Sequence, residues 1–172
     1  METDSESTVQ PTPVGPLSEP KLEPPNGMYP ARVDDKGRLK LPVGFQSFVS
    51  ALPEKKLFVT SLDRRIGQIY PIANWRESKR FLNEHRENPK AARDTLFNAQ
   101  DLGADSEMDG QGRVLLPPEM RRELGIENQS VHVFAYKGRI EILSEARYKE
   151  RKQAASEAAA AALETLEDAG LQ

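Results

Sequence analysis

One nonapeptide occurs twice in this chain, and that duplication restricts the fold more than any other feature. Residues 34–42 read Asp-Asp-Lys-Gly-Arg-Leu-Lys-Leu-Pro and residues 109–117 read Asp-Gly-Gln-Gly-Arg-Val-Leu-Leu-Pro, so five of nine residues recur at an offset of 75. Such a shared spacing indicates that one structural unit is present twice. In each copy a glycine turn places a carboxylate and a guanidinium four residues apart, and an apolar strand ending at proline follows. This arrangement presents an arginine and does not build a catalytic pocket.

The apolar residues around each nonapeptide predict a repeated β-β-α-β-β unit. In the first copy, alternation on both sides of the turn predicts a hairpin, followed by a short amphipathic helix and a second hairpin; these segments are 29–33 with 39–41, then 43–52, then 57–60 with 66–70. The corresponding segments of the second copy are Met108 with 114–116, then 118–124, then 131–134 with 139–143. Pro118 near the start of the second helix and Gly125 after its end support these helix boundaries.

Each unit alone has too few strands to enclose a core, so we expect the two units to share one. The predicted fold class is α+β, mainly β: a pseudo-twofold barrel from two β-β-α-β-β units, with both Asp-x-x-Gly-Arg turns at related positions on one surface. Two connector helices at 75–85 and 89–101, interrupted at Asn88-Pro89, are predicted between the units. One alanine-rich helix is predicted from Ser144 to Leu166.

The chain divides into five predicted segments: a disordered, Pro-rich, acidic tail at 1–26, a first unit at 27–74, a helical connector at 75–101, a second unit at 102–146 and an alanine-rich helical tail at 147–172. Six of the thirteen prolines lie in the first 26 residues, which lack the large apolar side chains that would offset the entropy of ordering. The C-terminal helix has Ser144 as its N-cap. Because its apolar face is mostly alanine, we expect a solvated or partner-contacting helix.

Charge and cysteine content narrow the classes of function. The net charge of -3 divides unevenly, because residues 27–147 hold 20 basic and 17 acidic side chains while both tails are acidic. A mildly basic body allows nucleic-acid binding only through a concentrated patch. The chain has no cysteine, and no apolar run approaches the ~18 residues of a membrane span. We therefore expect a cytoplasmic protein without a signal peptide or a membrane partner.

Arg38 and Arg113 are the main candidates for functional side chains. Each directly follows a turn glycine and lies four residues after an aspartate; these supporting residues are Gly37, Gly112, Asp34 and Asp109. Glycine accepts the positive φ of a tight turn, and the aspartate is close enough to hold the guanidinium. One interpretation is a structural clasp that only pins the hairpin. The other is a preorganised arginine that pairs bidentately with guanine.

The two turn tips differ in charge. Lys36 in the first turn would add a phosphate contact, whereas Gln111 takes its place in the second turn and donates hydrogen bonds without a charge. The predicted DNA-binding residues are therefore Arg38, Arg113, Lys36 and Gln111. We expect the first turn to hold the DNA backbone more firmly.

Other candidate residues favour structural roles. His85 and His132 have no carboxylate at a metal-ligand spacing on a common element, so no metal site and no cofactor are predicted. A nucleophile with a base partner and a phosphate-binding glycine-rich loop are both absent from the sequence. Tyr70 and Trp75 are typical of packing anchors. Three basic clusters fit either phosphate contacts or solvated faces: Arg64-Arg65, Arg121-Arg122 and 147–152.

At these residues the chain resembles the MraZ family of bacterial transcriptional regulators, which are built from two SpoVT/AbrB-type units. The motifs that carry the resemblance are Asp34-x-x-Gly37-Arg38-Leu39-x-Leu41-Pro42 and Asp109-x-x-Gly112-Arg113-Val114-x-Leu116-Pro117, supported by Tyr70-Pro71, Trp75, Asn88-Pro89 with Arg93, and Glu141. The resemblance covers about Gly27 to Tyr148. The chain departs from the family pattern at Gln46, Ala135, Leu143 and Tyr148, where the family often has Arg, Gly, Trp and Trp.

The resemblance implies an intertwined, swapped-hairpin AbrB-type barrel and assembly into rings of several protomers. It implies binding to short direct repeats in double-stranded DNA upstream of the division and cell-wall gene cluster, in the nucleoid. By motif position, Arg38 and Arg113 would contact DNA, Asp34 and Asp109 would support them, and Lys36 would be an accessory contact.

Three hypotheses follow, in decreasing order of support. The first is a sequence-specific DNA-binding transcriptional regulator that acts as a homo-oligomer. The alternative is a protein-interaction or antitoxin-like module that works through its two tails. The third is an enzyme using the Asp–Arg pairs, which would need a cleft and an activated nucleophile. Because the sequence contains neither feature, we predict no enzymatic activity and no small-molecule substrate.

Overall fold

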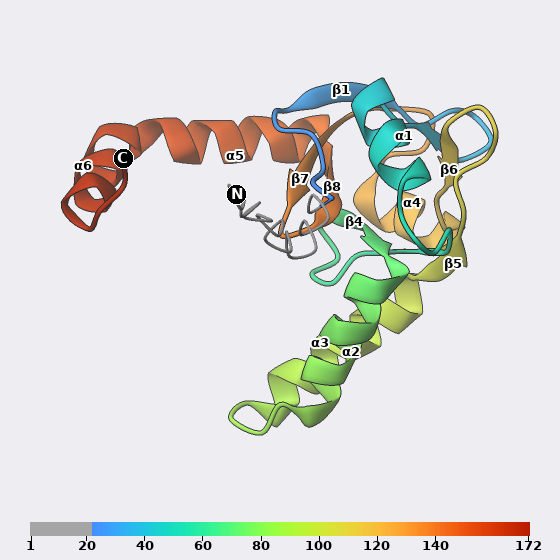
Figure 1. Cartoon of the computed structure of the whole chain (residues 1–172), viewed down its shortest axis with the longest axis horizontal. Helices are drawn as coiled ribbons and strands as arrows, with labels where there is room; N and C mark the ends of the chain where they lie inside the picture. The colour runs from blue at the N-terminus through green and yellow to red at the C-terminus, as the bar shows by residue number, and fades with distance from the viewer. Residues whose placement is uncertain (1–21) are drawn as a thin grey trace, which may run out of the picture.

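The computed structural model describes residues 22–172 and has an α+β fold whose sheets are antiparallel. Most of the tail predicted to be disordered, residues 1–21, lies outside the described part. The elements in chain order are β1 (Tyr29–Arg32), β2 (Arg38–Lys40), α1 (Val43–Ser50), β3 (Leu57–Thr60), β4 (Gly67–Pro71), α2 (Ile72–Glu84), α3 (Pro89–Leu102), β5 (Ala104–Ser106), β6 (Arg113–Leu115), α4 (Pro118–Leu124), β7 (Ser130–Tyr136), β8 (Arg139–Ser144), α5 (Glu145–Glu157) and α6 (Ala159–Asp168). Figure 1 shows their arrangement.

The strands pair mainly between the two sequence repeats. A six-stranded sheet has the order β1-β7-β8-β4-β3-β5, and β2 pairs with β6 in a second, two-stranded sheet. The hairpins predicted around the two nonapeptides are therefore wrong. Each turn is present, but the strands on its two sides pair with other strands. Only single bridges, Val33 to Leu39 and Met108 to Val114, join the two arms of each turn. Apolar alternation identifies a strand, but it does not identify the strand with which it pairs. That pairing depends on how the apolar side chains of both repeats are buried in one core.

The strand pairing is symmetric: each strand of the first repeat has the same kind of partner as the equivalent strand of the second repeat. β1 precedes the first turn and pairs with β7 of the second repeat, and β5 precedes the second turn and pairs with β3 of the first. The pairs β2–β6 and β4–β8 each join equivalent strands of the two repeats. The predicted hairpins β3–β4 and β7–β8 are present within their own repeats. Each repeat thus completes the other, as the shortage of strands in one unit requires.

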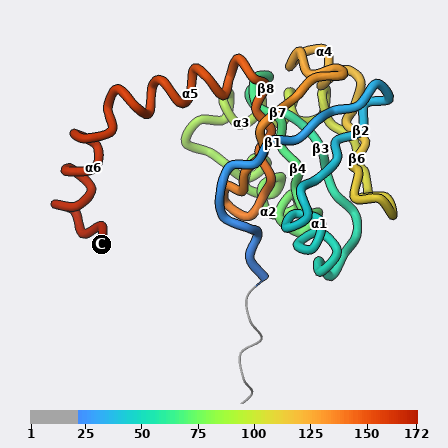
Figure 2. The backbone as a smooth tube through the Cα atoms, turned by 90° about the horizontal axis from the view of Figure 1, so that it is seen from above, coloured from blue at the N-terminus to red at the C-terminus, as the bar shows by residue number. Residues whose placement is uncertain are grey.

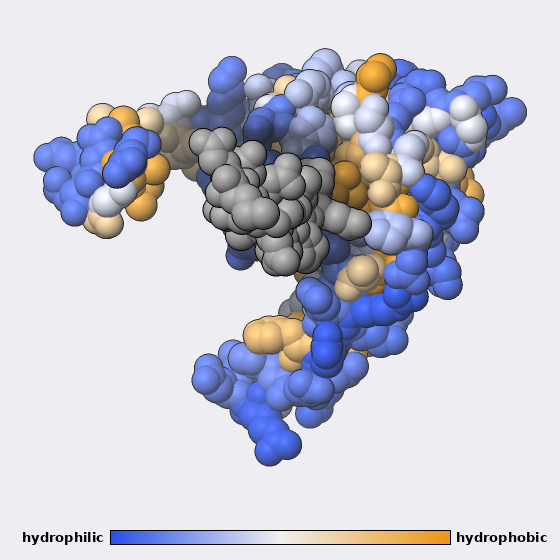
Figure 3. Space-filling model, viewed as in Figure 1, coloured by the Kyte–Doolittle hydropathy of each residue, from blue (hydrophilic) through white to orange (hydrophobic). Residues whose placement is uncertain are grey.

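A single main core lies between the two repeats. It contains buried apolar residues of both, including Leu39, Phe45, Val114 and Met120, each of which is fully enclosed. A second cluster attaches the connector helices to the outside of β3 and β4; its residues are Phe58, Tyr70, Ile72, Trp75 and Ala99. Beyond this cluster, α2 and α3 extend from the body as a helical hairpin (Figure 1). The hairpin is predominantly hydrophilic on the face that Figure 3 shows.

The C-terminal segment forms two helices where the sequence predicted one. Ser144 caps α5 as predicted, with its hydroxyl accepting from the amide of Arg147. The helix ends at Glu157, and Ala158, with φ -101° and ψ 3°, separates it from α6. No residue of either helix is buried, so packing does not hold a straight course through the alanine run. The two helices form an arm that leaves the body and then bends (Figures 1 and 2).

Candidate nucleic-acid interface

The first turn is held together by one carboxylate. One oxygen of Asp34, Oδ1, accepts hydrogen bonds from the amides of Lys36 and Arg38, at 3.0 and 2.8 Å. The other oxygen, Oδ2, accepts from Nε of Arg38 at 2.8 Å. Asp34 therefore fixes both the backbone of the turn and the direction of the guanidinium that follows it.

The second turn repeats this geometry atom for atom. Oδ1 of Asp109 accepts from the amides of Gln111 and Arg113, both at 2.9 Å, and Oδ2 accepts from Nε of Arg113 at 2.8 Å. In both turns the aspartate binds Nε. Among the described residues, the Nη nitrogens of Arg38 and Arg113 have no hydrogen-bond partner, so they remain free to meet an acceptor. The Asp–Arg pairs predicted from the sequence are present in the structure.

Backbone donors lower the pKa of both aspartates. The hydrogen bond from the Arg38 amide is the main cause that lowers the pKa of Asp34, and the Arg113 amide does the same for Asp109. The paired guanidinium contributes in the same direction in each turn. Each turn thus presents a half-exposed charged pair whose carboxylate is bound to the turn backbone and to the guanidinium.

The turn glycines are required for two reasons. Gly37 and Gly112 have φ values of +80° and +76°, in the left-handed region that L side chains rarely adopt. The space that a Cβ would take at each glycine is also occupied by another side chain. A Cβ on Gly37 would overlap the guanidinium of Arg121, and one on Gly112 would overlap the amide of Gln46.

Gln46 and Arg121 are equivalent residues, 75 positions apart, and the side chain of each lies against the turn glycine of the opposite repeat. Nε2 of Gln46 donates to the carbonyl of Leu41, and Nη1 of Arg121 donates to the carbonyl of Leu116, both at 2.7 Å. From the sequence, Arg121 fitted either a phosphate contact or a solvated face, and Gln46 was a departure from a family pattern. The repeat offset of 75 was the signal that relates them, but only the tertiary structure shows that the two repeats cross.

The strands that follow the turns bring the two arginines onto one face. In the β2–β6 pair, Leu39 lies opposite Val114, and both side chains are fully buried. Alternation therefore directs the four remaining side chains of the pair away from the core: Arg38, Lys40, Arg113 and Leu115. We call β2, β6 and the two turns (34–37 and 109–112) the arginine ribbon. The expectation that both turns lie at related positions on one surface agrees with this geometry.

Each turn is also tied to the strand of the other repeat. The amide of Leu41 donates to the carbonyl of Gly112, and the amide of Leu116 donates to the carbonyl of Gly37, both at 2.9 Å. Figure 2 shows β2 and β6 side by side, with the turns at opposite ends of the pair. The arginine ribbon is thus a single hydrogen-bonded unit and not two independent loops.

Lys40 is a basic residue of the ribbon that sequence analysis did not select. It lies opposite Arg113 in the strand register, and its ammonium group donates to the carbonyl of Gln111. The tip of the second turn, where Gln111 stands in place of a lysine, therefore receives a cation from the first repeat. Lys36 and Gln111 are exposed at their turn tips, as predicted.

Several of the other basic candidates are occupied in intramolecular contacts. Arg64 binds Asn98, Asp101 and Glu123 and so joins the β3–β4 turn to α3 and α4. Three more form ion pairs: Arg121 with Glu127, Arg122 with Glu119, and Arg147 with Glu150. These contacts commit the four arginines to the fold, whereas Arg65, Arg151 and Lys152 form no ion pair within residues 22–172.

Several further motif residues serve the fold. Trp75 stacks on Phe58 with ring centroids 4.4 Å apart, which confirms its role as a packing anchor. Asn88 caps α3 by accepting from the amide of Ala91. Glu141 is buried beside Arg139; burial raises the pKa of Glu141, while Arg139 opposes that rise.

His132 has a carboxylate partner that its sequence context did not reveal. Nε2 of His132 lies 2.8 Å from Oε2 of Glu145, and its ring stacks on Tyr148 with centroids 3.6 Å apart. This contact attaches the first turns of α5 to β7. Across residues 22–172, no group of three or more His, Asp or Glu side chains is arranged to hold a metal ion.

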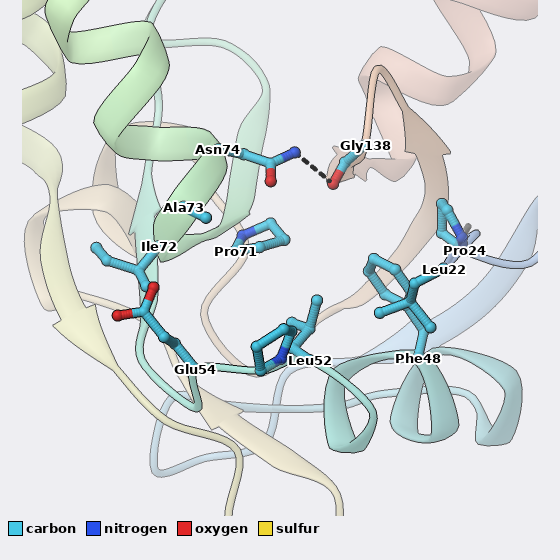
Figure 4. Close-up of a pocket in the computed structure, with 11 residues that line it drawn as sticks. Leu22, Pro24, Phe48, Leu52, Glu54, Pro71, Ile72, Ala73, Asn74 and Gly138 are labelled. Atoms are coloured by element: carbon cyan, nitrogen blue, oxygen red, sulfur yellow. Dashed lines mark hydrogen bonds between the residues drawn. The ribbon is translucent and has the colours of Figure 1, made fainter. Parts of the chain in front are cut away.

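A cavity of about 400 Å³ lies away from the arginine ribbon, between α1, the start of α2 and the β7–β8 turn (Figure 4). Its lining is mainly apolar, with a hydrogen bond from Asn74 to the carbonyl of Gly138 at 3.3 Å. Glu54 is the one ionisable residue among the residues that line it. Within the described part of the chain, no helix combines the length and the apolar character needed to span a membrane.

Comparison with known proteins finds one family. The MraZ family model, described as "MraZ protein, putative antitoxin-like", matches residues 103–169. Three relatives carry the name Transcriptional regulator MraZ. The protein of Acidobacterium capsulatum is 32% identical over 127 residues, which are 74% of this chain and 86% of the relative. That of Koribacter versatilis is 34% identical over 107 residues, 60% of this chain and 71% of the relative.

The third relative, from Desulfitobacterium hafniense strain Y51, is 30% identical over 148 residues, 84% of this chain and 98% of the relative. The matched regions of all three extend over most of both proteins and are long enough to include both nonapeptides. The resemblance inferred from the duplicated motif is therefore confirmed, and the chain belongs to the MraZ family.

Proposed function

We propose that this protein is a DNA-binding transcriptional regulator that contacts double-stranded DNA through the outer face of the arginine ribbon. The observation that carries the proposal is the pairing of β2 with β6, which brings Arg38 and Arg113 onto one solvent-facing surface. Each guanidinium is already oriented by an aspartate. The name shared by the relatives, transcriptional regulator, supports the same function.

The chemistry of the ribbon suits the major groove of DNA. The groove admits a two-stranded β-ribbon, and a guanidinium pairs bidentately with guanine O6 and N7. Because Asp34 and Asp109 hold Nε, the two Nη nitrogens are the donors left for a base. A side chain held in this way loses less rotamer entropy on binding. Lys36 and Lys40 would then neutralise phosphates on either side of the contacted bases.

We infer that the body is a pseudo-twofold, swapped-hairpin barrel of two SpoVT/AbrB-type units. The exchange of strand partners between the two repeats supports this inference. The bridges at Val33–Leu39 and Met108–Val114 connect the two-stranded sheet to the two edges of the six-stranded one. The barrel would thereby have no free edge strand, a property of closed sheets.

We further propose that the protein acts as a homo-oligomer, in a ring, on short direct repeats upstream of the division and cell-wall gene cluster. One ribbon offers few base contacts, so the affinity for an operator would come from several ribbons that engage neighbouring sites together. The unburied arm of α5 and α6 and the projecting α2–α3 hairpin are the elements available for contacts between protomers. Such a protein would act in the cytoplasm, on the nucleoid.

The binding test compares the wild-type chain with Arg38→Ala and Arg113→Ala on a duplex from the chain's own upstream region, across a range of salt concentrations. Loss of one bidentate contact, worth about 1–3 kcal/mol, would weaken binding by about 5- to 150-fold, and each lost phosphate neutralisation would reduce the salt dependence. Arg80→Ala is the matched control, because Arg80 is an exposed arginine on α2. Wild-type binding by both ribbon variants would refute the proposed role of the two arginines.

The family description also favours a second function, an antitoxin-like interaction with another protein. In that case the two ends of the chain would be the working parts, because α5 and α6 bury no residue against the body. Removal of residues 1–21 and 153–172 keeps the stack of Tyr148 on His132 and separates the two functions. A DNA regulator keeps its affinity for a single operator repeat, whereas an interaction module loses its partner.

A further inference from the structure

The arginine ribbon has one exposed apolar residue, Leu115. Its side chain is 54% exposed, whereas its neighbours Val114 and Leu116 are fully buried. Strand alternation explains the difference, because Val114 faces the core and Leu115 must then face outward. A single exposed leucine is common on protein surfaces, so exposure alone has no functional meaning. The position of Leu115 among charged residues is the informative feature.

The strand register makes the two ends of the ribbon unequal. Leu115 lies directly opposite Arg38, and its equivalent in the first repeat, Lys40, lies directly opposite Arg113. One end of the ribbon therefore presents an arginine beside an apolar side chain, and the other presents an arginine beside a lysine. The first pair offers a base two different kinds of contact, whereas the second pair offers only positive charge.

We propose that Leu115 is a specificity-determining residue that contacts the C5-methyl group of a thymine next to the base bound by Arg38. This inference rests on the proposed function of the ribbon. Thymine is the base that presents a methyl group in the major groove, and apolar side chains read it there. Directly opposite residues of an antiparallel pair have Cβ atoms about 4.5–5.5 Å apart, and stacked bases are about 3.4 Å apart along each strand. Leu115 thus reaches the same base step as Arg38 or the adjacent one.

The Leu115 side chain also has no donor or acceptor for the polar edges of the other bases. The Arg38–Leu115 end of the ribbon is accordingly the sequence-selective end. The Lys40–Arg113 end combines one base-reading arginine with a phosphate-binding lysine, and it tolerates more sequences. Each end thus has one phosphate-binding lysine, Lys36 or Lys40, but only the Arg38–Leu115 end adds an apolar contact.

The experiment uses the full chain and a pool of duplexes with a randomised core, selected for binding to the wild-type protein. The tightest duplex is then synthesised with deoxyuridine in place of each thymine in turn, which removes only the methyl group. We expect one such replacement to weaken wild-type binding about fourfold, the value of one buried methyl-sized group. The same replacement leaves Leu115→Ala unaffected, and Leu115→Val keeps part of the discrimination. Met28→Ala, at an exposed apolar residue outside the ribbon, the α2–α3 hairpin and the α5–α6 arm, is the matched control.

Two results would overturn the inference. One is a selected sequence without a thymine next to the required guanine; the other is a deoxyuridine effect that is equal in the wild type and in Leu115→Ala. Failure of the proposed function gives a different result, because Arg38→Ala and Arg113→Ala would then both bind the selected duplex as the wild type does. Because Leu115 is exposed, its variants should unfold at the wild-type urea concentration, which verifies that the fold is intact.

Discussion

At the scale of single residues, the two aspartates determine the shape of the ribbon as well as its charge. Each accepts two backbone amides and one guanidinium nitrogen, and this one side chain replaces the hydrogen bonds that a longer hairpin would supply. Each glycine that follows leaves room for a side chain of the opposite repeat. Asp34, Gly37 and Arg38 therefore form one structural unit, and a change in any of them disturbs the other two.

Replacement of the turn glycines should destabilise the protein. Gly37→Ala and Gly112→Ala each introduce a Cβ at positive φ and displace the Arg121 or Gln46 side chain below, so we expect a loss of about 1–3 kcal/mol in the free energy of unfolding. Urea denaturation measures the loss. Gly110→Ala is the control, because nothing lies within 4 Å of its added Cβ. Equal stability of all three variants would contradict this account.

Stability should fall in acid because of the two aspartates. Asp34 and Asp109 have lower pKa values in the folded protein than the ordinary value of 3.8. Their stabilisation is therefore present above that value and is lost as the pH falls through the folded pKa values. Urea midpoints measured from neutral pH down into this range should decline more in the wild type than in the Asp34→Asn, Asp109→Asn double variant. Asp35→Asn, in the same turn, should decline like the wild type.

At the scale of elements, the short strands β2 and β6 combine two functions. Their inner face completes the main core with Leu39 and Val114, and their outer face forms the proposed DNA surface. Three-residue strands are too short to persist alone, so the ribbon exists only because the core beneath it is filled. The same coupling holds for α1 and α4, whose Gln46 and Arg121 lie against the turn glycines of the opposite repeats.

Truncation of the inner face should cost far more stability than truncation of the outer face. Leu39→Ala leaves a cavity in a fully buried position, and we expect a loss of about 2–5 kcal/mol. Leu115→Ala, one strand away and exposed, should change the free energy of unfolding by less than about 0.5 kcal/mol. Thermal or urea unfolding gives both values. A large loss at Leu115 would show that the outer face is packed against something.

At the scale of the whole molecule, the body and the α5–α6 arm differ in burial. The body carries the ribbon, whereas the α5–α6 arm has no buried residue and exposes Leu163, Leu166 and Leu171 near its end. Apolar side chains at that end are visible on the surface in Figure 3. This division suits a protein whose body binds DNA and whose extensions contact neighbouring protomers.

Multivalent binding provides the test at this scale. If several ribbons of one assembly bind together, a duplex with two correctly spaced repeats should bind about 100-fold or more tightly than a duplex with one. The measurement compares the two duplexes at one salt concentration and repeats the comparison with the spacing changed by half a helical turn. A gain of only twofold, as expected from two independent sites, would argue against oligomeric binding.

The sequence by itself determined the repeated unit, the family, the two Asp–Arg pairs and most of the elements, since these depend on local spacing, turn chemistry and apolar periodicity. Only the tertiary structure decided which strands pair, because the fully buried Leu39 and Val114 meet across 75 residues of chain and no local pattern specifies such a contact. That long-range choice brought Arg38, Lys40, Arg113 and Leu115 together. It also placed Arg121 and Gln46 beneath the opposite turns, and it left α6 free to bend at Ala158, where no packing opposes the bend.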